Sequence, residues 1–257
     1  MALTTLELVI IIIVAFVPAI LYMLWIRSAE IHEREPFLAV EGVFIYGLTI
    51  ALGLAFVLEL VAVSIIDSLT GGALNAVTMN IILAIILAPL IEEFTKATGV
   101  FAVHRRLTEP ENGLVYGAAC GLGFAAGENV LYYTSSLTAG VEIFLLTVIA
   151  RTLTSTLLHT SATAISGFGI SRSQCFRSWY GVGKSWLPYF LVAVLIHAAF
   201  NFLAIIGSDI LPNASGEVML LSLFLSVLLV WTSVRYIRRK IVQLDRMNAE
   251  SGPKRCQ

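Results

Sequence analysis

The sequence predicts an all-α, polytopic membrane protein with seven transmembrane helices, an outside N-terminus and a cytoplasmic C-terminus. Hydrophobic residues make up 58% of the 257 residues and charged residues only 13%, and the mean hydropathy is +0.89. A soluble domain averages about 25% charged residues. A bilayer core of about 30 Å needs about 20 apolar residues per helix. The chain divides into seven such stretches, at residues 6–26, 40–66, 74–103, 112–134, 141–170, 186–207 and 216–237.

The distribution of basic residues supports this number of spans. Lysine and arginine occur after the first, third, fifth and seventh stretches, and they are absent from the N-terminus and from residues 67–73, 135–140 and 208–215. Cytoplasmic loops carry an excess of Lys and Arg. The alternation therefore places the N-terminus outside and the tail in the cytoplasm, and it predicts a multi-pass protein of the cell membrane.

The domain organisation is simple. We expect residues 1–240 to form a single seven-helix transmembrane domain and residues 241–257 to form a short polar cytoplasmic tail. The first stretch is interpreted as a retained anchor, because no Lys or Arg precedes it and it is too long for a signal-peptide core. Three scattered cysteines, Cys120, Cys175 and Cys256, predict neither a disulfide framework nor a metal site.

Polar side chains interrupt four of the apolar stretches. Placing a charged side chain at the centre of a membrane helix costs roughly 2.5 to 3.5 kcal/mol, so such residues default to a functional interpretation. Counting about 1.5 Å per residue from the cytoplasmic helix ends puts three of them at roughly 16 to 18 Å and the deeper Glu128 and Asn201 at about 22 to 24 Å. The sequence thus predicts one polar layer near the membrane centre, made by Glu92, Glu93, Glu128, His159, His197 and Asn201.

Helix spacing suggests how some of these groups are arranged. Lys96 follows Glu92 by four residues, so the two share a face and form either part of a site or a structural ion pair. Pro89 removes a backbone donor and predicts a bend that frees the carbonyl of Ile85. Arg151 is expected near the outer face, paired with Glu142.

For other polar or small residues a structural role is a sufficient interpretation. Glu59 has no motif around it and is interpreted as structural, and Asn129 as a packing amide. Asn201 is equally well explained as an interhelical hydrogen bonder. Four glycines in the fourth stretch leave a thin helix surface that suits a close contact or a cavity; they are residues 117, 121, 123 and 127.

Hydrolysis by an activated water is the economical chemistry for this residue set. A carboxylate would take the proton of the water, while imidazole N–H groups and the Asn amide would stabilise the oxyanion. In a second version two imidazoles and a glutamate hold a divalent metal such as zinc, with another glutamate as the base; the candidate ligands are Glu128, His159 and His197. A serine mechanism through Ser155 or Ser161 has no supporting motif.

Four segments carry a resemblance to a known family. They are similar to the motifs of the PrsW family of intramembrane proteases, which is related to the CAAX prenyl endopeptidases in the superfamily of glutamate-dependent membrane peptidases. The similarity covers about residues 85–205, in the same order and helix placement. The segments are Glu92-Glu93-Phe94-Thr95-Lys96, Phe124-Ala125-Ala126-Gly127-Glu128-Asn129, His159, and His197-Ala198-Ala199-Phe200-Asn201.

The resemblance implies an endopeptidase that cuts a membrane-anchored protein substrate in or near the bilayer. In bacterial relatives the substrate is an anti-sigma factor, cleaved in the first step of a regulatory cascade. By this resemblance Glu92 or Glu93 is the base and Glu128 the acid of the second motif. His159, His197 and Asn201 complete the catalytic set, with Lys96 and Asn129 in support. Zinc and metal-free glutamate mechanisms both remain open.

Two other functional classes compete with a protease. A non-catalytic seven-helix scaffold would be expected to lack the first-motif glutamates, and both are present. An ion or proton transporter would use similar acid and His chains, but the sequence has no inverted repeat or paired broken helices. The expected partners are a membrane-anchored protein substrate and the lipid bilayer, with no nucleic acid; the sequence does not define an oligomeric state.

Overall fold

The structure, a computed structural model, describes residues 3–251 and Cys256 and confirms the all-helical fold with seven helices long and apolar enough to cross a membrane. No strand occurs among the residues described. The helices are α1 (Thr5–Arg27), α2 (Phe37–Tyr46), α3 (Leu52–Thr70), α4 (Ala76–Ile82), α5 (Ala88–Ala102), α6 (Asn112–Ala139), α7 (Val141–Leu153), α8 (Ser155–Tyr180), α9 (Leu187–Ile205) and α10 (Gly216–Ser251).

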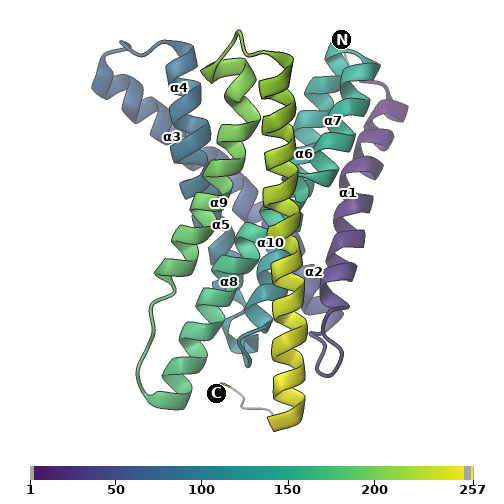
Figure 1. The fold of residues 1–257 in the computed structure, drawn as a ribbon, viewed down its shortest axis with the longest axis vertical. Helices are drawn as coiled ribbons and strands as arrows, with labels where there is room; N and C mark the ends of the chain where they lie inside the picture. Colours follow the sequence, from purple (N-terminus) through teal and green to yellow (C-terminus); the bar gives the residue numbers. More distant parts are fainter. Residues whose placement is uncertain (1–2, 252–255, 257) are drawn as a thin grey trace.

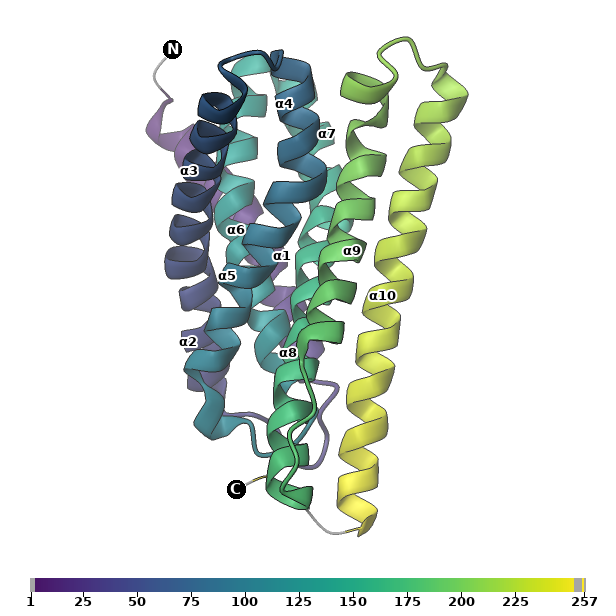
Figure 2. The ribbon, with the colours of Figure 1, turned by 90° about the vertical axis from the view of Figure 1, so that its left-hand side faces the viewer.

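Three of the seven spans are composite. The π-helical turn Gly47–Ala51 joins α2 to α3, and a second π-helical turn, Leu83–Leu87, joins α4 to α5 just before Pro89. The fifth span breaks at Thr154, whose φ of −125° and ψ of −75° leave the helical region, so α7 and α8 are separate helices. The two ends of the chain lie at opposite ends of the bundle, as an odd number of spans requires (Figures 1 and 2).

Helix α6 is the central helix of the bundle. Its most apolar 18-residue window is 83% buried, whereas 33% or less is buried in the corresponding windows of the other six spans. The thin glycine surface serves close contact with α8: a Cβ at Gly113, Gly117 or Gly121 would collide with a backbone carbonyl oxygen of α8. The atom that meets Gly121 is the carbonyl oxygen of His159. The backbone contact therefore sets the position of this imidazole.

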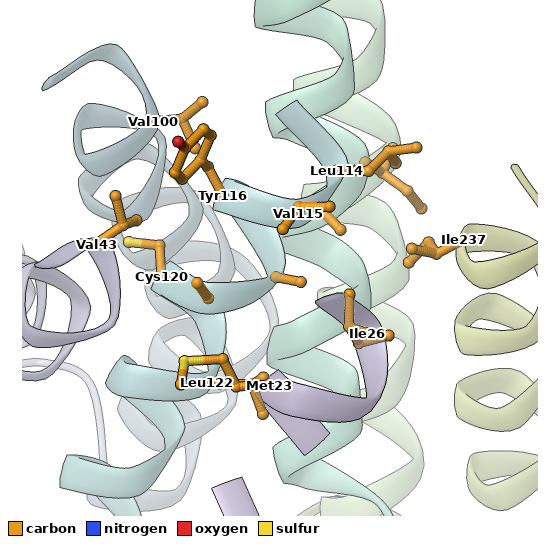
Figure 3. Packing of buried hydrophobic residues seen from close by; sticks show 14 of the residues in the cluster. Met23, Ile26, Val43, Val100, Leu114, Val115, Tyr116, Cys120, Leu122 and Ile237 are labelled. Atoms are coloured by element: carbon orange, nitrogen blue, oxygen red, sulfur yellow. The ribbon is translucent and has the colours of Figure 1, made fainter. Parts of the chain in front are cut away.

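The other faces of α6 are covered mainly by α1, α2, α5 and α7. Gly123 lies against the carbonyl of Phe44, so α2 approaches α6 as closely as α8 does. Figure 3 shows part of the apolar core, in which Met23 and Ile26 of α1 and Ile237 of α10 belong to the same cluster as the α6 side chains. This apolar packing joins the first and the last span to the central helix.

Substituting Gly121 should disturb both stability and the His159 position. We expect Gly121→Val to lower the free energy of unfolding by about 1 to 3 kcal/mol, because the added side chain overpacks a backbone contact. The control is Gly53→Ala in α3, which has open space at the Cβ position and should change stability by less than about 1 kcal/mol. Thermal unfolding in detergent compares the stability of the two variants. Equal midpoints would refute the close-contact interpretation.

The C-terminal end is more structured than the sequence predicts. Residues 241–251, expected in a polar tail, continue α10, and Ile241 and Asp245 are buried. The expectation of no disulfide is wrong: Cys175 of α8 and Cys256 form one, with Cα atoms 4.6 Å apart, while Cys120 is free and buried. The partners are 81 residues apart in sequence, and they can meet because α8 and α10 run in the same direction and end at the same end of the bundle (Figure 1).

A cluster of buried carboxylates joins α10 to two loops at this end. Asp245 accepts hydrogen bonds from the backbone N–H of Ile31 at 3.0 Å and of His32 at 3.2 Å. Burial, with repulsion from neighbouring carboxylates, raises the pKa of Glu30 to about 8, and burial with Glu109 nearby raises that of Glu111 to about 8. The cluster comprises Glu30, Glu35, Glu109, Glu111 and Asp245.

This cluster predicts a pH-dependent stability. A carboxyl group whose pKa is raised on folding binds protons in the folded state that the unfolded state releases. The free energy of unfolding should therefore fall as pH rises from the ordinary glutamate value of 4.5 through about 8. Glu30→Gln with Glu111→Gln should flatten this slope, while Glu217→Gln, at an exposed position, should leave it unchanged. Melting curves across this pH range test it; the same slope in all three proteins would contradict the prediction.

Candidate active site

The polar residues of the predicted layer converge around one buried ammonium group. Glu92 and Glu93 come from α5, and the Lys96 side chain of the same helix is completely buried. Its Nζ lies 3.0 Å from Glu92 Oε2, 2.8 Å from Glu93 Oε1 and 2.8 Å from Nδ1 of His159 on α8. The Phe124 ring lies 4.1 Å from the same nitrogen. Lys96 is thus shared between both glutamates and an imidazole, and is more than an isolated helix-surface pair.

Each imidazole is oriented by a carboxylate. His197 Nδ1 lies 3.0 Å from Glu93 Oε1, and His159 Nε2 lies 2.9 Å from Glu128 Oε2. Because an ionised carboxylate only accepts hydrogen bonds, these two nitrogens are the donors. The remaining nitrogens, His159 Nδ1 and His197 Nε2, face Glu92 Oε2 at 3.7 and 3.8 Å. Glu92 therefore lies where both imidazoles converge.

The paired glutamates have different environments. Glu93 is fully buried, and its second oxygen accepts a hydrogen bond from Thr163 Oγ1 at 3.0 Å, so its contacts are all with protein groups. Glu92 forms part of the wall of a cavity of about 480 Å³. Of the two acids, Glu92 is therefore the one that a water molecule or a substrate in the cavity can reach.

Several helices contribute polar side chains to the cavity wall. Besides Glu92 it includes Glu128, His159, His197 and Asn201 from the predicted layer. Sequence reasoning assigned Glu59 to structure, yet Glu59 also lines this cavity, as do Asn80 and Asp209. The sequence signal for Glu59 was that it is an acid in an apolar span with no motif around it. Only the packing of α3 against α5 shows that it lies at the cavity wall.

Arg151 differs from its expected placement near the outer face with Glu142. Its guanidinium lies 2.7 Å from Glu128 Oε2 and donates a 2.7 Å hydrogen bond from Nε to Asn129 Oδ1. Asn129 in turn donates to Thr156 Oγ1 at 3.0 Å. The packing of α7 against α6 explains the difference, because it brings the guanidinium to Glu128, the carboxylate that also contacts His159.

Asn201 bridges two helices. Its Nδ2 donates a 2.8 Å hydrogen bond to the carbonyl of Ala84, within the π-helical turn that precedes Pro89. The freed carbonyl thus lies one residue before the expected Ile85. Asn201 satisfies this carbonyl and also lines the cavity, so it combines the packing role with a place in the site.

Three of these residues have the composition of a metal site. The ligand atoms of Glu92, His159 and His197 lie within 4.8 Å of one another. Two imidazoles with one carboxylate are a ligand set of catalytic zinc, and a carboxylate on the far nitrogen of each imidazole is typical of such sites. Glu92 thus takes the place expected for Glu128, because Glu128 contacts the opposite nitrogen of His159. Lys96 would have to give up its contact with His159 Nδ1 for an ion to bind there.

Seven helical spans around a buried cluster of acids and imidazoles define a polytopic membrane protein with the residues for hydrolysis. Residues 35–232 match the family described as PrsW family intramembrane metalloprotease. This match covers most of the chain, so the protein belongs to the PrsW family.

Named relatives agree with the family. The chain is 29% identical to Protease PrsW of Geobacillus kaustophilus over 183 residues, which cover 69% of this chain and 74% of the relative. It is 24% identical to Protease PrsW of Clostridioides difficile over 199 residues, covering 76% and 79%. No solved structure matches the chain significantly. The protein is an intramembrane protease. Of the three functional classes considered from the sequence, the comparisons therefore favour a protease over a scaffold or a transporter.

Proposed function

We propose that the protein hydrolyses a peptide bond of a membrane-anchored protein substrate with a water molecule that Glu92 activates. The observation that carries this proposal is the position of Glu92: it lines the cavity, and its Oε2 faces His159 Nδ1 and His197 Nε2 at 3.7 and 3.8 Å. A carboxylate in hydrogen-bond reach of a cavity water is the geometry of a general base.

The neighbouring side chains supply positioning and proton transfer. Glu93 holds His197 so that Nε2, with its lone pair, faces the cavity; this nitrogen receives the proton from Glu92 and passes it to the leaving amine. Glu128, held by Arg151, fixes the ring of His159. Asn201 uses one N–H for Ala84, and its second N–H is directed to the oxyanion that forms on the attacked carbonyl.

The same residues fit a divalent ion. Glu92, His159 and His197 would hold it, and a bound ion would lower the pKa of its water and polarise the substrate carbonyl. In that version Glu92 would be a ligand, and Glu128, which also lines the cavity and contacts His159, would be an acid in position to exchange protons with water. Glu92 is essential in both versions.

The substrate class follows from the setting of the site. A cavity lined by five of the seven spans suits a protein segment that is itself in the membrane. By the family resemblance, the substrate is an anti-sigma-like single-span factor and the cut is the first step of a regulatory cascade. The proposed orientation in the cell membrane has the N-terminus outside, because the basic loops lie at the other end.

Removing the carboxylate of Glu92 tests the catalytic assignment. We expect Glu92→Gln to abolish cleavage of a doubly tagged single-span membrane protein, the reporter, chosen because its processing depends on co-expression of this protein. His197→Ala should lose at least about a hundredfold in rate, the typical size of an acid–base contribution. Glu142→Gln, on the exposed face of α7, is the control. Immunoblots of both tags provide the measurement, and full processing by Glu92→Gln would refute the assignment.

Metal binding has a readout that does not depend on activity. We expect zinc added to metal-free protein to raise the thermal midpoint, because an ion bound only by the folded state stabilises it. His197→Ala should lose this shift, and Glu142→Gln should keep it. Elemental analysis gives the stoichiometry. If zinc fails to shift the unmodified protein, the metal version is rejected and Glu92 acts as the base.

A further inference from the structure

A second and larger hollow lies beside the candidate active site. It has a volume of about 770 Å³ and is bounded by the junction of α7 and α8, by α9 with the π-helical turn Ile206–Ile210, and by the first part of α10. Its wall on α10 includes Met219, Ser222, Leu223 and Ser226. Leu223 is 51% exposed, so this hollow is a groove on the lipid-facing side of the bundle. We call it the α9–α10 groove.

The α9–α10 groove adjoins the site cavity. Arg151, Ser155, Phe200 and Ala204 belong to the walls of both. Two other apolar hollows, one on α3 and one between α1 and α7, share no residue with the site cavity. A molecule in the α9–α10 groove therefore has only the shared wall between it and Glu92.

The wall of the groove has the chemistry of a peptide-binding surface. Its apolar part comes from Met219, Leu220 and Leu223, and glycines 207 and 216 leave room beside the helices. The hydroxyls of Ser222 and Ser226 each donate to a carbonyl of their own helix at 2.9 Å, which leaves their oxygen lone pairs to accept further hydrogen bonds. A backbone unwound in lipid must find such partners, whereas an acyl chain has no use for them.

We propose that the α9–α10 groove admits the apolar transmembrane segment of a single-span protein substrate and leads it, locally unwound, past Phe200 to Glu92. This inference rests on the proposed proteolytic function and adds the entry route and the binding surface. The serine and glycine content of the wall serves the substrate backbone, while the leucine and methionine side chains contact its apolar side chains. The shared residue Arg151 stays engaged by Glu128, so no unpaired charge faces the incoming segment.

A bulky side chain in the groove should slow the entry of the membrane substrate without slowing peptide-bond hydrolysis itself. We expect Ser226→Trp to slow cleavage of the reporter at least about tenfold, while a short detergent-soluble peptide containing the same scissile bond is cleaved at the unmodified rate. The matched control is Leu228→Trp, two residues along α10 and 48% exposed outside the groove; it should process both substrates normally.

The outcomes separate this inference from the proposed function. If Ser226→Trp cleaves the reporter at the unmodified rate, the proposed entry route is wrong. It is also wrong if a folded Ser226→Trp protein loses reporter cleavage and peptide cleavage equally. If the unmodified protein cleaves neither substrate, the proposed function itself fails.

Photocrosslinking provides a second measurement that does not need an active enzyme. With p-benzoylphenylalanine in place of Leu223 in the Glu92→Gln protein, light should produce an adduct with the reporter in reconstituted vesicles. The same group in place of Leu228 should give mainly lipid adducts. Adducts with lipid alone at position 223 would overturn the proposal, whether or not Ser226→Trp folds.

Discussion

The ammonium of Lys96, buried without solvent contact among Glu92, Glu93 and His159, is the interaction on which the site depends. Removing one partner of a buried ion pair typically costs about 3 to 5 kcal/mol, because the remaining charge has no water to replace it. Here one cation offsets two carboxylates and also holds an imidazole. The ion-pair interpretation of Lys96 is therefore confirmed, while its supporting role in catalysis stays a prediction.

A steric constraint supports the electrostatic one. Glycines on two faces of α6 let the backbones of α2 and α8 come into direct contact with it. Lipid provides no hydrophobic force between helices, so close packing of small residues is what holds them together. The same contact places His159 within hydrogen-bond distance of Glu128 on α6 and Lys96 on α5. Stability and site geometry thus depend on the same helix interface.

Much of the fold and of the site composition was predictable, for identifiable reasons. Span lengths follow from bilayer thickness. Hydrogen bonds that include Lys96 link five of the six polar residues of the predicted layer, because each is too costly to leave alone in lipid. The errors concern the partner of Arg151 and the disulfide of Cys175, and the position of Glu59 at the cavity wall was not expected. Each depends on a helix break or on contacts between distant segments, which leave no periodic signal in the sequence.

The sequence by itself determined the number of spans and the residues that must find polar partners inside the membrane, since hydropathy and charge are properties of single residues. Tertiary structure decided which partners they found. Both glutamates of the first motif are equivalent in sequence, yet packing enclosed Glu93 among His197, Lys96 and Thr163 and left Glu92 at the cavity wall. The difference arises from helix rotation and neighbour placement, which only the assembled bundle defines.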